Sequence, residues 1–127
     1  MMTPKPIRVF VYKNLHQTRK NGQPWYSVQA LEGDFKGRVI HRSGTVLLAH
    51  AKGVVREGGR QRVLREGKKN VHAGMVGELI SLLPQDFVGQ RVTYNPYLRG
   101  EFFNPITEEA FKGADRVYLH EDGVRAA

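Results

Sequence analysis

The chain contains no cysteine among its 127 residues. This excludes a disulfide scaffold, a thiol nucleophile and any thiolate metal site, and it is typical of a protein of the reducing cytosol. No apolar run approaches the roughly 18 residues of a membrane-spanning helix. The N-terminal residues 1–13 contain two prolines and then alternate, so they lack the apolar centre of a signal peptide. We therefore expect a soluble, intracellular protein with no membrane partner.

Sequence signatures of catalysis are also missing. Gly67-Lys68-Lys69 lacks the glycine spacing and the hydroxyl of a phosphate-binding P-loop. No serine lies in a G-x-S-x-G elbow, and the five histidines show no local metal-ligand spacing. We expect no catalytic residue, no metal and no cofactor. A hydrolase or nuclease is the weaker alternative.

Apolar and charged residues are both present in ordinary amounts, 40% and 25% of the chain. These proportions are typical of a folded globular protein, and 127 residues fit one domain. We predict a single domain over residues 1–127.

Positive charge is concentrated in one part of the sequence. Residues 1–72 carry fifteen Lys/Arg and four Asp/Glu, a net charge of +11, whereas residues 73–127 carry a net of −3. The segment Lys52–His72 alone has seven Lys/Arg and two Glu. Such a basic surface indicates an anionic partner, with nucleic acid as the commonest class and phosphorylated small molecules or acidic proteins as others.

Alternation of apolar and polar residues dominates over the helical period. The longest apolar run is Val71 to Leu83, in which Gly74 and Gly77 indicate bulges or sharp coiling. Its odd positions form the better core face: Val71, Ala73, Met75, Leu79 and Leu83. We predict a mainly β protein (α+β at most), either a single small antiparallel sheet or a partly closed SH3-like barrel, with one short helix near 59–67. Asn21-Gly22 predicts the turn of a hairpin with a long basic tip, while 106–113 is compatible with a helical turn or a loop. The predicted strands cover residues 7–12, 25–31, 38–41, 45–51, 71–83, 91–94, 101–103 and 116–120.

Gly67 would end the predicted helix 59–67. The cations of this segment point in different directions around the helix. At about 100° per residue, Arg62, Arg65 and Lys69 share one face and form a solvated rim, opposite the apolar Val63. Arg60 is directed toward the core boundary. An arginine there needs a carboxylate, a carbonyl cluster or a bound anion, so we expect either a salt bridge to Glu78 or Asp86 or an anion site.

Lys68 and His72 extend this basic segment, and His72 would lie on the less apolar face of the long strand. Lone histidines are more often structural than functional. Tyr94 and Tyr97 flank the Asn95-Pro96 turn, where their rings could stack on bases. The candidate ligand or nucleic-acid site is therefore Arg60, Arg62, Arg65, Lys68, Lys69, His72, Tyr94 and Tyr97.

Two resemblances add to these expectations. Residues 33–39 (GDFKGRV) resemble the turn of the KOW motif of small SH3-like barrels, which implies a small barrel and contact with RNA or nucleoprotein. Four further pieces resemble an uncharacterised family of small basic proteins encoded by bacteriophages and mobile elements. That resemblance implies a bacterial or phage-infected host cell, with nucleic-acid handling or inhibition of host defence as the setting. Its carriers are residues 8–15, 59–66, 69–73 and 92–97.

The leading functional hypothesis is thus a binding protein whose 52–72 surface engages an anionic partner, most often nucleic acid. The alternative is an anti-defence inhibitor that binds a host immune protein or sequesters a signalling nucleotide. An oligomer is compatible with either hypothesis.

Overall fold

The protein folds as one antiparallel sheet with a single short helix in the described part of the chain, residues 6–18 and 24–127 of the computed structural model. The predicted mainly β class and the short helix are confirmed. The predicted Asn21-Gly22 turn lies outside the described residues. The elements are β1 Arg8–Thr18, β2 Pro24–Ala30, β3 Val39–Ser43, β4 Val46–Val55, α1 Glu57–Glu66, β5 Ala73–Ser81, β6 Gln90–Tyr94, β7 Phe102–Phe103, β8 Ala114–His120 and β9 Gly123–Ala126.

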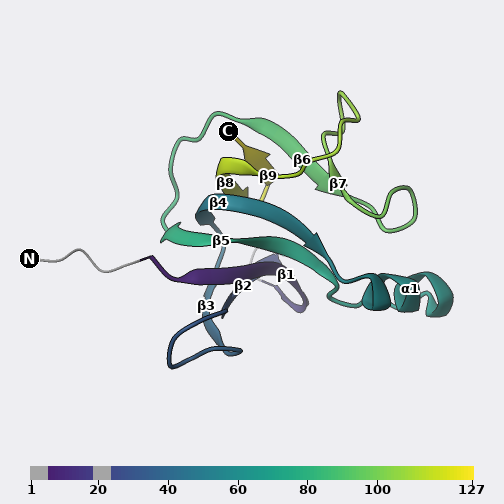
Figure 1. Ribbon diagram of the computed structural model, residues 1–127, viewed down its shortest axis with the longest axis horizontal. Helices are drawn as coiled ribbons and strands as arrows, with labels where there is room; N and C mark the ends of the chain where they lie inside the picture. The colour runs from purple at the N-terminus through teal and green to yellow at the C-terminus, as the bar shows by residue number, and fades with distance from the viewer. Residues whose placement is uncertain (1–5, 19–23) are drawn as a thin grey trace, which may run out of the picture.

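The strand order is β3-β2-β1-β5-β4-β8-β9-β6-β7, with every pairing antiparallel. β5 therefore lies between β1 and β4, and α1 connects β4 to β5 at one end of the sheet (Figure 1). The sheet is strongly curled. The Tyr26 hydroxyl on β2 donates a hydrogen bond to the His120 carbonyl at the end of β8, at 2.8 Å, although three strands separate them in the sheet.

Alternation along the strands produces two different faces. Val9 and Val11 on β1 are fully buried in the core on the concave side. Phe10, on the opposite face, is also buried, and the Arg56 guanidinium lies 4.9 Å from its ring centroid. β1 is therefore covered on both faces, as its sequence predicts. The concave core also draws on β2, β4, β5, β6, β7 and β8 through Tyr26, Val28, Val46, Leu48, Ala51, Met75, Val92, Phe102, Val117 and Leu119.

The two glycines of β5 allow neighbouring strands to approach closely. A Cβ on Gly74 would lie 2.4 Å from the Val11 carbonyl oxygen, and one on Gly77 would lie 2.9 Å from that of Ala49. The predicted irregularity is real, and one of the two register shifts between β4 and β5, the one between Ala49 and Lys52, coincides with a positive φ of 48° at His50 on β4. The prediction for Leu83 is wrong: β5 ends at Ser81, and the Leu83 side chain is 72% exposed.

The helix begins two residues earlier than the sequence predicts and ends where predicted. Gly67 adopts φ 69°, and its N–H donates to the Val63 carbonyl at 2.9 Å, which is a left-handed C-terminal cap. Glu57 lies in the first turn, where a carboxylate is favourable to the helix dipole. Lys69 therefore lies beyond the helix and not on its outer face. Residues 106–113, left open by the sequence, form a loop: a turn ends at Thr107, and the rest is irregular except for an isolated bridge from Ala110 to Phe103.

Candidate functional site: a pocket beside the basic helix

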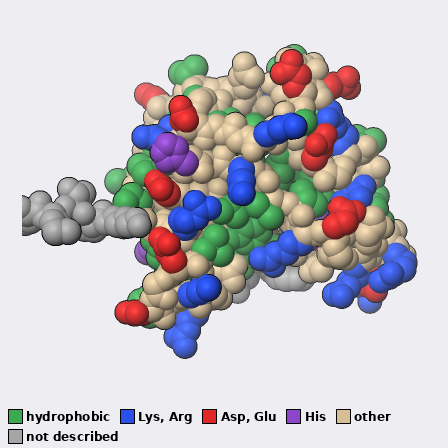
Figure 2. Space-filling view, viewed as in Figure 1, with side chains coloured by type: hydrophobic (Ala, Val, Ile, Leu, Met, Phe, Trp, Pro, Cys, Tyr) green, Lys and Arg blue, Asp and Glu red, His purple; other side chains and the backbone are tan. Residues whose placement is uncertain are grey.

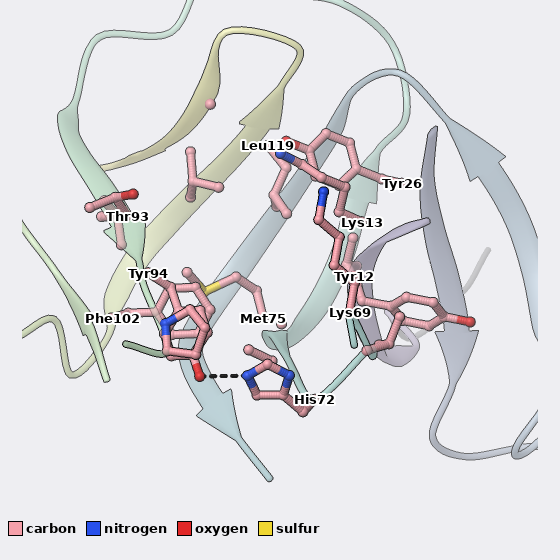
Figure 3. Close-up of a pocket in the computed structure, with 18 of the residues that line it drawn as sticks. Tyr12, Lys13, Tyr26, Lys69, His72, Met75, Thr93, Tyr94, Phe102 and Leu119 are labelled. Carbon is pink, nitrogen blue, oxygen red and sulfur yellow. Dashed lines mark hydrogen bonds between the residues drawn. The ribbon is translucent and has the colours of Figure 1, made fainter. Parts of the chain in front are cut away.

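A pocket of about 450 Å³ opens on the concave side of the sheet, next to α1. Its volume lies within the range of small-molecule sites, roughly 300–1,000 Å³. The wall is formed by segments far apart in the sequence, including β1, β5, β6 and the residues that follow α1. Figure 3 shows Tyr26, Met75, Phe102 and Leu119 around this space.

Aromatic rings form much of the wall. Tyr12, Tyr26, Tyr94, Tyr97 and Phe102 all line the pocket. The Tyr94 ring is 5.2 Å from that of Phe102, at a tilt of 35°. Burial raises the pKa of Tyr26 to about 12, and burial also raises the pKa of Tyr94, against the opposing effect of the Arg60 charge. Both hydroxyls therefore remain protonated at neutral pH.

His72 lies just before β5 and is buried, with 6% of its surface exposed. Its Nδ1 is 2.8 Å from the Asn70 carbonyl oxygen, and its Nε2 is 2.6 Å from the Tyr94 hydroxyl (Figure 3). A carbonyl oxygen can only accept, so Nδ1 carries the proton. In the neutral ring, Nε2 then accepts from the Tyr94 hydroxyl. His72 thus joins the segment after α1 to β6, and both of its nitrogens have partners.

Arg60 fixes α1 to the loop that follows β6. Its Nε donates to the Pro96 carbonyl at 3.2 Å, and its Nη1 donates to Glu57 at 2.8 Å. The predicted partner Glu78 or Asp86 is therefore wrong, because Glu57 lies one helical turn away on the same element. Hydrogen bonds from Gln61 and Arg60 lower the pKa of the Glu57 carboxyl.

A close contact holds the helix against His72 as well. A Cβ on Gly59 would lie 2.7 Å from the His72 Cβ, so only glycine permits this approach. Val63 is buried and lines the pocket from the helix side. The helix is thus part of the pocket wall.

The structure divides the predicted site residues into two sets. Lys69, His72, Tyr94 and Tyr97 line the pocket. The residues Arg60, Arg62, Arg65 and Lys68 do not.

Arg62 and Arg65 are exposed on the outer side of α1, and within the described chain neither side chain forms an ion pair or hydrogen bond. The predicted grouping of Lys69 with this outer rim is wrong, since the helix stops at Glu66 and the chain then turns toward the pocket.

Sequence reasoning missed Lys13, which lines the same pocket from β1. The signal was present in the alternation, because Lys13 continues the concave-facing series Val9, Val11. Asn70 and Met75 were likewise not chosen as site residues. No local pattern marks them. Met75 reaches the wall because β5 pairs between β1 and β4, and Asn70 lies in the segment that joins α1 to β5.

A second pocket, of about 430 Å³, lies between β6, β9 and the 104–114 segment. Its charged lining residues are Arg91 and Glu109, one of each sign. Within the described residues, no group of three His, Asp or Glu is placed to hold a metal ion. The helix that the structure describes is too short to cross a bilayer.

Comparison with known proteins gives one consistent relationship. Residues 2–127 match the family model described as the Mycobacterium phage L5 gene 82 protein. The Gene 82 protein of Mycobacterium phage L5 is 73% identical over 126 residues, which cover 99% of this chain and all of that protein. No solved structure matches the chain significantly. The chain therefore belongs to the phage L5 gene 82 protein family.

Proposed function

We propose that this phage protein is a nucleic-acid-binding protein that engages phosphates through α1 and the residues that follow it. The observation that carries the proposal is the exposed cation series Arg62, Arg65, Lys68 and Lys69, which continues from the helix to the mouth of the pocket. Figure 2 shows Lys and Arg side chains gathered at the end of the molecule where α1 lies. Binding, and not catalysis, is the proposed activity, in the cytoplasm of the infected host cell.

The availability of these cations supports phosphate contact. Arg62 and Arg65 have no carboxylate partner in the described structure, so no internal ion pair must be broken when a phosphate binds. Arginine also offers a planar set of donors that matches phosphate geometry. Lys68 and Lys69 contribute point charges next to them.

The test is fluorescence anisotropy with labelled single-stranded and duplex DNA and RNA, using the double variant Arg62→Glu with Arg65→Glu. We expect affinity to fall by at least tenfold, since two favourable phosphate contacts become repulsive. The matched control is Arg91→Glu with Lys112→Glu, the same charge change at exposed positions away from α1. An equal loss in both double variants would show that net charge, and not this surface, determines binding.

Salt dependence gives a second measure of the same surface. Contact with about five phosphates predicts a log–log slope of affinity against salt near −4 to −5. Affinity that does not change between low and moderate salt would contradict the proposal. The resemblance of residues 33–39 to a KOW turn is compatible with RNA as the partner. In the structure, residues 33–38 lie in the connection between β2 and β3, and Val39 begins β3.

A second candidate, an anti-defence inhibitor that binds a host immune protein, is favoured by a different observation. Tyr97, Leu98 and Ile106 are between 64% and 82% exposed on the loops around β7. Arg99 donates to the Glu108 carbonyl and so ties these two loops together. Loss of host-protein capture in Leu98→Asp with Ile106→Asp, with nucleic-acid affinity retained, would favour this candidate.

A further inference from the structure

We propose that the pocket beside α1 holds a single nucleotide unit, with the base among the aromatic side chains and the phosphate between Lys13 and Lys69. This inference rests on the proposed function and deepens it, because it assigns a ligand to the pocket at the inner end of the same basic surface. The nucleotide unit has two possible sources, a free nucleotide or one unstacked residue of a nucleic-acid strand.

The positive charge of the pocket wall favours an anionic ligand. Among the described residues that line the pocket, Lys13 and Lys69 carry full charges, and no lining residue is an Asp or a Glu. Both lysines are exposed, so their ammonium groups can reach a ligand while they remain in contact with water. The second pocket has a similar volume but is lined by both Arg91 and Glu109, so its charged side chains are of both signs.

The lysines lie at one end of the pocket. In Figure 3, Lys13 and Lys69 extend toward Tyr26 and Leu119, whereas the His72–Tyr94 hydrogen bond lies at the opposite end. The ligand that fits is therefore asymmetric, with an anionic end and an apolar end. A nucleotide has this division between phosphate and base.

The apolar end favours a planar ring over an alkyl chain. Tyr94, Phe102 and His72 form a cluster of rings with centroids 5.2–5.4 Å apart, and Tyr97 lines the same wall from the next loop. Aromatic side chains stack on bases with about 1–3 kcal/mol per base. The Met75 thioether lines the same wall and is adaptable to an aromatic edge.

Hydrogen-bonding groups at this end suit a base edge. The Tyr94 hydroxyl gives its proton to His72, so its oxygen keeps acceptor capacity for an amino group. The exposed Asn70 carboxamide, which also lines the pocket, offers both donors and an acceptor. These groups are held by the contact of α1 with His72 and by the bond from Arg60 to Pro96.

The pocket continues into the exposed cations of α1. Lys69 lines the pocket, and Lys68 and Arg65 precede it in sequence on the outer surface. A strand with one residue in the pocket would therefore have its neighbouring phosphates beside these cations. A free nucleotide would use Lys13 and Lys69 alone.

The experiment measures binding of adenosine, guanosine, cytidine and uridine monophosphates, inorganic phosphate, a fatty-acid anion and a six-residue single-stranded oligonucleotide by calorimetry and by amide chemical shifts. We expect at least one mononucleotide to bind and to shift amides of 69–75 and 92–97. We also expect Lys13→Glu to weaken that nucleotide at least tenfold. The control Lys112→Glu makes the same charge change at an exposed lysine that does not line the pocket, and it leaves affinity within twofold. Both positions are exposed, and circular dichroism confirms that each variant is folded.

The outcomes separate this inference from the proposed function. If a mononucleotide binds, Lys13→Glu abolishes that binding and no oligonucleotide binds, the pocket assignment is retained and the nucleic-acid function is rejected. The double variant Arg62→Glu with Arg65→Glu could lose oligonucleotide binding while Lys13→Glu leaves it unchanged. That result retains the nucleic-acid function and overturns the pocket assignment. Equal binding of phosphate alone or of the fatty-acid anion also overturns it, because the base would then contribute nothing.

Discussion

The outer side of α1 and one part of the pocket wall belong to the same basic segment, Lys52–His72, yet they differ in how their residues are held. Arg62 and Arg65 project into solvent without a protein partner in the described structure. His72, a few residues later, is buried with both ring nitrogens bonded. The outer side is therefore adaptable and tolerant of substitution, whereas the pocket wall is preorganised and sensitive to it.

The adjacent glycines of α1 test this difference most directly. A Cβ on Gly58 meets nothing within 4 Å, whereas one on Gly59 lies 2.7 Å from the His72 Cβ. Alanine gains up to about 1 kcal/mol over glycine in a helix interior, and because both glycines lie in the first turn of α1, any such gain is similar at the two positions. We expect Gly58→Ala to be the more stable variant by about 1–3 kcal/mol in urea unfolding, because overpacking penalises only Gly59→Ala. Equal stabilities would show that α1 can move away from His72 freely.

A buried tyrosine of the pocket makes stability depend on alkaline pH. Because the pKa of Tyr26 is raised from 10.0 to about 12, the folded state holds this proton more tightly than the unfolded state. The contribution is fully present below pH 10 and is lost as the pH rises toward 12. The free energy of unfolding should fall by about 2 kcal/mol more in the wild type than in Tyr26→Phe over this window. Parallel pH profiles of the two proteins would contradict this assignment.

The smallest of the three expected effects on stability concerns two arginines on α1. Arg60→Met removes the bonds to Pro96 and Glu57, whose net contribution to stability is on the order of 1 kcal/mol. Arg62→Met removes no bond that the described structure contains, so its effect should stay within about 0.5 kcal/mol. Thermal unfolding of both variants measures the difference. A larger loss of stability in Arg62→Met than in Arg60→Met would mean that Arg62 makes a stabilising contact on the outer side of α1.

The two resemblances stated from the sequence differ in what the comparisons with known proteins support. The family match over residues 2–127 supports the phage relationship and confirms that part of the expectation. It does not extend to the KOW-like turn. Gly33 and Gly37 do adopt positive φ values of 82° and 89° in the β2–β3 connection, as tight turns require.

Residues close together in the sequence determined several features of this fold. Alternation placed Val9, Val11 and Phe10 on the correct faces of β1, and Gly67 marked the end of α1, because both signals depend on residues close in sequence. The basic character of 52–72 was equally readable. The tertiary structure alone decided that Lys13 and Lys69 share a pocket, that His72 bonds Tyr94 and that Arg60 bonds the Pro96 carbonyl. The first two contacts depend on β5 pairing between β1 and β4 and on the sheet curling, and no local period encodes an arrangement of strands that are distant in sequence.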